Sequence, residues 1–225
     1  MISIAFTGQD GTGKSLQVER LRGRLAGDGA RVAVVHQYGA TTALGAALVP
    51  LAKSIANRIG LFSRGRAEPA QARPAAQAER KHAGWLRRAA ASLSLRVGRR
   101  RSLANLRRHR ALDVLILDRC YADEIIRAVY KFGHGTELGL RLLGRLPAPT
   151  LGFCFSVAPR TGYERKKTRE MSLAEYEEKA RVAGDILGAA GRSWNLVSIR
   201  VDGLTPDDVF DRVWAHVREH LAAVG

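Results

Sequence analysis

GQDGTGKS, residues 8–15 of the chain, matches the pattern G-x-x-x-x-G-K-[ST], whose glycines let successive backbone N–H groups curl around a polyphosphate. An apolar run at residues 2–6 precedes the motif, as a buried strand would, and a helix-compatible segment at residues 14–26 follows it. The positive end of that helix's dipole would add to the attraction for phosphate. This order of strand, loop and helix predicts a site for a nucleoside triphosphate.

The residue types within this motif indicate separate roles. Lys14 is placed to reach the β- and γ-phosphates, and the Ser15 hydroxyl is placed to ligate a magnesium ion. We therefore predict ATP and Mg²⁺ as the cofactors. The other residues of the motif that are predicted to contact the nucleotide are Gly8, Asp10, Gly11, Thr12 and Gly13.

Five short apolar runs alternate with helix-compatible segments along the chain. This alternation predicts an α/β fold of the P-loop NTPase kind, three α/β/α layers built on a five-stranded parallel sheet that is covered on both faces. A last helix is expected at residues 207–223, because Thr205-Pro206 provides a start signal and apolar residues recur there at helical spacing. The five predicted strands are residues 2–6, 31–35, 114–117, 151–157 and 196–201.

The length of 225 residues suits a single P-loop domain, residues 1–225, with an elaboration. No apolar run approaches the roughly 20 residues needed to cross a membrane, and the chain begins directly with a predicted strand. Cys120 and Cys154 lack metal-ligand spacing, and the histidines share none, so we expect ordinary buried thiols and structural or surface histidines. These features predict a cytoplasmic protein.

The formal net charge of +16 is unevenly distributed. Residues 62–110 hold 14 Lys or Arg against two acidic residues, within a basic helical insertion assigned to residues 40–110. A long insertion of this kind typically contains the binding site for the second substrate, which accepts the phosphoryl group. Its positive charge suits an anionic partner such as a membrane surface, with which the protein would associate peripherally. A poorly ordered insertion is the alternative. Within it we expect a helix at residues 41–59, a loop at 63–76, and at 77–110 one long helix or two with a break near Gly98.

A second candidate site follows the predicted strand at residues 114–117, where the chain reads Asp118-Arg119-Cys120-Tyr121. The carboxyl end of a parallel strand lies at the ligand-binding edge of such a sheet. Asp118 could hold magnesium through water, and Arg119 could neutralise a phosphate of the acceptor. A turn with a surface ion pair is the alternative.

A third candidate is a lid at residues 158–172, which precedes a helix expected to begin at a capping box formed by Ser172 and Glu175. Cations that close over the γ-phosphate stabilise the negative charge that spreads over its oxygens during transfer. A solvated charged surface is the alternative. The clustered cations are Arg160, Arg165, Lys166, Lys167 and Arg169.

DGTGKS, DRCY and a basic lid followed by an acidic helix, in this order, resemble the thymidylate kinase family of nucleoside monophosphate kinases. The resemblance covers most of the chain outside residues 60–110, and VDGLTPD at residues 201–207 is similar to the family's loop beside the adenine. The resemblance implies a five-stranded parallel sheet. It also implies that Asp10 lies near the acceptor, Arg119 grips its phosphate, Arg165 and Arg169 serve the lid, and Asp202 lies beside the nucleotide.

The chain departs from the family at residues 36–40, where HQYGA replaces a usual Arg-Glu-Pro-Gly. The identity of the acceptor therefore has two alternatives. One is the phosphate of a nucleoside monophosphate such as dTMP, which needs no general base. The other is a hydroxyl of a sugar, glycan or lipid-linked saccharide in polysaccharide biosynthesis. For a hydroxyl, Asp10 is the predicted base, with Asp123 or Glu124 behind it. A nucleic-acid-binding NTPase ranks last, because aromatic residues scarcely interleave the arginines. A homodimer is also allowed.

Overall fold

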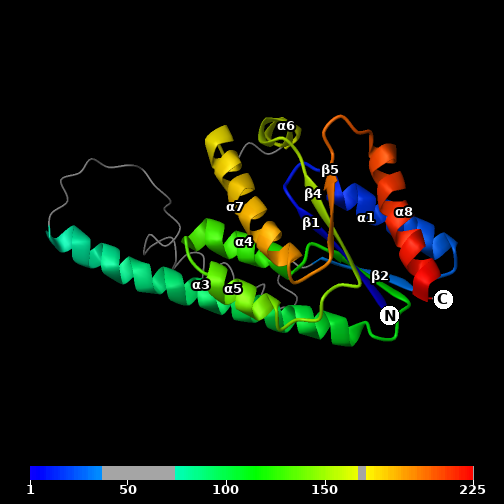
Figure 1. The fold of residues 1–225 in the computed structure, drawn as a ribbon. Coiled ribbons are helices and arrows are strands. Elements are labelled where there is room, and N and C mark those ends of the chain that lie inside the picture. The colour runs from blue at the N-terminus through cyan, green and yellow to red at the C-terminus, as the bar shows by residue number, and fades with distance from the viewer. Residues whose placement is uncertain (37–73, 167–170, 225) are drawn as a thin grey trace.

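The structure, a computed structural model, describes residues 1–36, 74–166 and 171–224, the side chains of 74–83 and 224 excepted. Figure 1 shows a twisted sheet with helices on both sides. The strands are β1 (Ile2–Gly8), β2 (Val32–His36), β3 (Val114–Asp118), β4 (Leu151–Ser156) and β5 (Leu196–Arg200). The seven described helices are α1 (Lys14–Gly27), α3 (Pro74–Arg108), α4 (Tyr121–Phe132), α5 (Thr136–Leu143), α6 (Pro159–Arg165), α7 (Leu173–Gly191) and α8 (Pro206–Val224).

The sheet has the strand order β2-β3-β1-β4-β5, and all neighbouring strands are parallel. The register pairs Phe6 with Asp118 and Gly8 with Phe155, so the carboxyl ends of β1, β3 and β4 meet at one edge. All five predicted strands are present, and no bound differs from the predicted one by more than two residues. The prediction of an α/β fold with a five-stranded parallel sheet is confirmed.

Each face of the sheet has its own hydrophobic core, because successive residues of a strand point to opposite faces. Ile4 and Phe6 of β1 belong to a core shared with α1 and α8, whereas Ala5 belongs to a core shared with α4, α5 and α7. α3 packs along α4 and α5 on this second face (Figure 1). The arrangement is compatible with three layers, helices above and below a central sheet.

α3 is one continuous helix of 35 residues, so the alternative of a break near Gly98 is wrong. Gly98 instead allows α3 to approach α4 closely, since a Cβ there would lie 3.3 Å from Glu124 Cγ and 3.4 Å from the Tyr121 ring. The Tyr121 hydroxyl also donates to the Leu95 carbonyl oxygen at 2.9 Å. The glycine that suggested a break is a packing position.

The remainder of the basic insertion is described only in part. Residues 74–76 were expected in a loop but begin α3, because proline is tolerated in the first turn of a helix. The predicted helix at residues 41–59 and the predicted loop at 63–73 lie outside the described residues. Within the described ranges, no helix is both long and apolar enough to cross a bilayer.

The predicted lid begins with a helix. α6 starts at Pro159, and the preceding Ala158 N–H donates to the Asp202 carboxylate at 3.0 and 3.1 Å. The predicted capping box is present at the start of α7, where the Ser172 hydroxyl accepts from the Glu175 N–H at 3.3 Å and the Glu175 carboxylate accepts from the Ser172 N–H at 2.7 Å. Lys167 and Arg169 lie outside the described residues.

Candidate functional site

The glycine-rich loop, residues 8–15, is held by close backbone contacts with β4 and α6. Gly8 has a φ of 124°, and a Cβ there would lie 2.0 Å from the Phe155 carbonyl oxygen. Gly11 has a φ of 79°, and a Cβ there would lie 2.6 Å from the Gly162 carbonyl oxygen. Only glycine combines these dihedral angles with such close approach. The neighbouring elements therefore set the shape of the loop.

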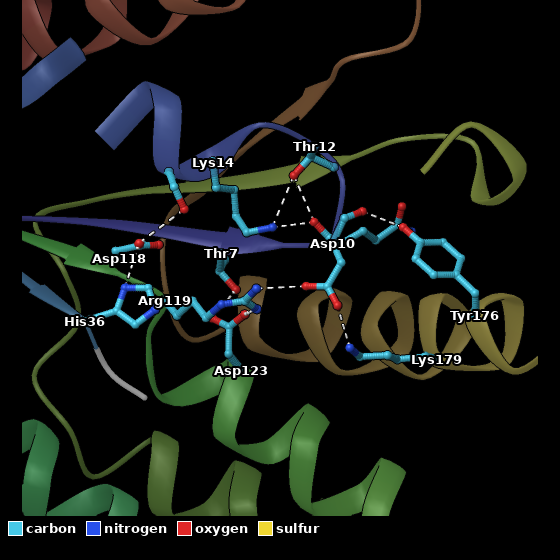
Figure 2. A network of polar contacts seen from close by, with 12 residues as sticks. Thr7, Asp10, Thr12, Lys14, His36, Asp118, Arg119, Asp123, Tyr176 and Lys179 are labelled. Carbon is cyan, nitrogen blue, oxygen red and sulfur yellow. Dashed lines mark hydrogen bonds and ion pairs between the residues drawn. The ribbon is translucent and has the colours of Figure 1, made fainter. Parts of the chain in front are cut away.

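Lys14, the first residue of α1, is buried, with 5% of its surface exposed. Its ammonium folds back over the loop and donates to the Gln9 carbonyl oxygen and, at 3.2 Å, to Thr12 Oγ1 (Figure 2). No carboxylate in the described part of the chain forms an ion pair with it. Burial, aided by the nearby Arg119 guanidinium, lowers the pKa of Lys14 to about 8. A buried ammonium with neutral partners is costly, and an anion bound beside it would offset that cost.

Asp118, the last residue of β3, is buried next to the start of α1. Its Oδ2 lies 3.4 Å from Ser15 Oγ and 2.7 Å from Nδ1 of His36, which ends β2 (Figure 2). Its Oδ1 is buried and has no hydrogen-bond partner among the described residues. An unpartnered carboxylate oxygen beside a serine hydroxyl fits a magnesium ion, which prefers oxygen ligands. Because the described residues contain no group of three or more His, Cys, Asp or Glu that could hold a metal, such an ion would take its other ligands from phosphate and water.

Asp10 connects the loop with two other parts of the fold. Its Oδ1 accepts from Arg119 Nη2 at 2.8 Å, its Oδ2 accepts from Lys179 Nζ of α7 at 2.6 Å, and its carbonyl oxygen accepts from the Tyr176 hydroxyl (Figure 2). Burial favours the neutral acid, but the charges of Lys179 and Arg119 outweigh it and hold the pKa of Asp10 well below its ordinary value. Asp10 is therefore a fixed anion between two cations.

Arg119 is positioned by its backbone and by a buried carboxylate. Its φ of 71° lies in the left-handed region, which is unusual for a residue other than glycine, and its N–H donates to the Phe6 carbonyl oxygen at 2.9 Å. Asp123, with 2% of its surface exposed, accepts from the Thr7 hydroxyl at 2.7 Å and the Cys120 N–H at 2.9 Å. Asp123 Oδ1 also lies 3.4 Å from Arg119 Nη1. These contacts direct the guanidinium toward the glycine-rich loop.

The structure brings together only part of the predicted site. Arg165 is exposed at the end of α6, and Arg169 lies outside the described residues. Asp202 accepts from the Ala158 N–H and, at 2.8 Å, from the Arg200 guanidinium, so it fixes the start of α6. The predicted residues that meet at the carboxyl edge of the sheet are Asp10, Thr12, Lys14, Ser15, Asp118 and Arg119.

Sequence analysis missed three residues that shape this site. Lys179 and Tyr176 come from α7, which the sequence indicated only as an acidic helix behind the lid. No local signal could have selected them, because their contacts with Asp10 join residues 169 and 166 positions apart. His36 was interpreted as a structural or surface residue. Its place at the carboxyl end of a strand beside β3 was the signal that could have identified it.

Comparison of the chain with protein-family models found no match, and a search of the curated proteins found none either. A functional conclusion therefore depends on the geometry at this edge of the sheet. There the glycine-rich loop, α1, β3, the turn between β3 and α4, α4 and α7 contribute three cations and three carboxylates. The cations are Lys14, Arg119 and Lys179, and the carboxylates are Asp10, Asp118 and Asp123.

Proposed function

We propose that this chain is a P-loop kinase, dependent on ATP and Mg²⁺, that phosphorylates the phosphate of a nucleoside monophosphate such as dTMP. The observation that carries the proposal is the buried ammonium of Lys14, whose described partners are neutral oxygens. A polyphosphate is the anion that suits this place, because the loop lies between the first strand and first helix at the ligand-binding edge of a parallel sheet.

The start of α1 supports a triphosphate as the donor. Its N-cap is Gly13, which offers no side chain to the first N–H groups of the helix, and its first turn contains no acidic residue. The first N–H groups of a helix lack partners within the helix and carry the positive end of its dipole. Phosphate oxygens would accept from these groups while Lys14 contacts the β- and γ-phosphates.

Ser15 and Asp118 would hold the magnesium ion, Ser15 through its hydroxyl and Asp118 through water. Asp118 Oδ1 supports this assignment, because a buried carboxylate oxygen normally has a donor or a cation beside it and this one has no partner in the described part of the chain. When bound, Mg²⁺ neutralises charge that develops on the phosphate oxygens during transfer. The protein's part is to orient that oxygen and the serine hydroxyl toward the loop.

Arg119 and Lys179 support an acceptor that is itself a phosphate. Arg119 Nη2 lies 2.8 Å from Asp10 Oδ1, and Lys179 Nζ lies 2.6 Å from Asp10 Oδ2. Guanidinium and ammonium groups are common partners of phosphate. A phosphate acceptor is already ionised and needs no general base, which agrees with the lowered pKa of Asp10. The proposal then relies on positioning and on cations around the transferred group, with Arg165 and Arg169 of the lid as further contributors.

The choice of a nucleoside monophosphate rests on the resemblance of DGTGKS and DRCY to thymidylate kinases. A kinase for a sugar, glycan or lipid-linked hydroxyl is the second candidate, and one observation favours it. His36 Nδ1 lies 2.7 Å from Asp118 Oδ2. His36 ends β2, where the sequence departs from the family's usual acceptor loop. An imidazole in this place could take the proton of a hydroxyl acceptor, which Asp10 between its two cations would do poorly.

ADP release measured in a coupled assay, with Mg-ATP and a panel of nucleoside monophosphates and sugars, tests the proposal. We expect turnover with at least one monophosphate, a diphosphate product, and no turnover when the acceptor or Mg²⁺ is omitted. Turnover with sugars alone would establish the second candidate instead. Turnover with none of the panel, combined with no ATP binding in calorimetry, would remove the kinase proposal as a whole.

A further inference from the structure

The exposed side of α3 has an unusual composition. Over residues 84–108, every exposed position is either an arginine or an apolar residue. None of these arginines forms an ion pair with a described residue. We call this surface the outer face of α3, and its residues are Trp85, Arg88, Ala89, Leu93, Arg96, Val97, Arg100, Ala104, Arg107 and Arg108.

The outer face is not used for packing against the described residues of the chain. Successive residues of an α-helix turn by about 100°, so the outer face covers one side of α3, and the buried positions Ala91, Leu95 and Gly98 cover the other. Gly98 contacts Glu124 and Tyr121 of α4. α3 is therefore attached to the fold by one side while the other side faces outward.

Three large apolar side chains on the outer face are exposed far more than a core position would be. Trp85 is 57% exposed, Leu93 65% and Val97 45%. Only two other large hydrophobic side chains among the described residues are comparably exposed, and neither lies on α3. Apolar side chains gathered on one surface indicate an interaction site rather than scattered exposure.

From this surface we infer that the protein docks on an anionic membrane through the outer face of α3. Apolar side chains would enter the boundary between headgroups and acyl chains, where tryptophan is favoured, and the arginines would contact lipid phosphates. This inference goes beyond the proposed kinase activity and does not depend on it.

Two other occupants fit the surface less well. A second copy of the chain would oppose one arginine-bearing face to another with no acidic residue on either, and like charges repel. Single-stranded nucleic acid is bound through aromatic side chains on which bases stack, and the outer face has one aromatic residue, Trp85. An anionic bilayer uses both the charge and the apolar side chains.

Vesicle flotation with the full chain tests this inference. Phosphatidylcholine vesicles that contain about 30 mol% phosphatidylglycerol should bind the protein at low salt, and pure phosphatidylcholine vesicles should not. The combined change Arg96→Gln, Arg100→Gln and Arg107→Gln should lower the partition constant by about a hundredfold, since each arginine near the surface contributes about fivefold. The change Trp85→Ser, Leu93→Ser and Val97→Ser should lower it by at least about a hundredfold as well.

A matched control removes the same charge elsewhere. Arg22, Arg192 and Arg218 are exposed outside α3, and changing all three to Gln should leave vesicle binding within about twofold of the wild type. Equal losses in this control and in the α3 arginine variant would overturn the inference, because net charge alone would then explain the binding. Circular dichroism confirms that each variant is folded.

Fluorescence provides a second readout that does not depend on flotation. Trp85 is exposed in the free protein, so its entry into the bilayer should shift the emission to shorter wavelength. The change Trp85→Phe should remove most of this shift while vesicle binding persists. Absence of vesicle binding would overturn the inference. If the protein then self-associates or binds nucleic acid, and changing Trp85, Leu93 and Val97 removes that binding, the surface belongs to one of the other occupants.

Discussion

The glycine-rich loop and the outer face of α3 both concentrate positive charge, but they hold it in opposite ways. Lys14 is 5% exposed and its ammonium is directed at two oxygens of its own loop, whereas Arg96, Arg100 and Arg107 are exposed and have no described ion-pair partner. A buried, oriented cation selects a ligand of one size and position, and exposed cations create a field for an extended anionic surface. The net charge of +16 thus includes cations that are held in two different ways.

Replacing the buried cation should give the largest effect. We expect Lys14→Met to reduce phosphoryl transfer by about a thousandfold, because the charge on the β- and γ-phosphates would lose its ammonium partner. The change should not destabilise the ligand-free protein, since it removes a buried charge that lacks an anion, and the free energy of unfolding should stay constant or rise by about 1–3 kcal/mol. Steady-state kinetics and urea denaturation measure the two quantities.

The exposed arginines provide the contrast for that prediction. The α3 variant with Arg96, Arg100 and Arg107 changed to Gln should retain turnover with soluble acceptor to within about twofold. A large loss of turnover in this variant would show that the glycine-rich loop and the outer face of α3 belong to one site. A loss of stability in Lys14→Met would show instead that Lys14 is a structural residue of the loop.

Lys179 should give an intermediate effect that separates a binding role from a structural one. We expect Lys179→Met to raise the KM for the acceptor by about tenfold and to leave the KM for ATP unchanged, because in the proposed function Lys179, the partner of Asp10 Oδ2, binds the acceptor phosphate. The same increase should appear when Asp10→Asn is already present. If Lys179 acted only by holding the Asp10 carboxylate, the second change would add nothing. Lys131→Met, at an exposed position on α4, is the matched control.

The smallest effect concerns pH. Burial lowers the pKa of Lys14 from its ordinary 10.5 to about 8, and a bound triphosphate would raise it again. ATP binding should therefore take up part of a proton at a pH above about 8, and the affinity should fall as the pH rises further. Calorimetry in two buffers with different ionisation enthalpies measures this uptake, which Lys14→Met should abolish. Uptake that persists in Lys14→Met would assign the proton to another group.

The same shift has a consequence for the ligand-free protein. Between about pH 8 and 10.5, the unfolded chain binds more protons at Lys14 than the folded chain does, so its contribution to stability rises with pH across this window. Urea denaturation at several pH values within this window measures that slope, which Lys14→Met should remove.

Much of the fold followed from local patterns in the sequence. Each apolar run at the right length for a buried strand formed one, and the capping box at Ser172 and the start signal at Pro206 marked helix starts that the structure confirms. Gly98 left the prediction open between one helix and two, because a glycine inside a helix has two physical uses, a break or a close contact. Only the position of α4 distinguishes them.

Local sequence patterns were enough to predict the strand, loop and helix around Lys14 and the carboxylate at the end of β3, because turn glycines, the periodicity of apolar residues and strand ends are short-range properties. Only the packed fold brings Lys179 and Tyr176 to Asp10, brings His36 to Asp118, and leaves one side of α3 exposed. Such pairings depend on how helices pack on the sheet. Packing is a property of many distant residues together, so no local pattern contains it.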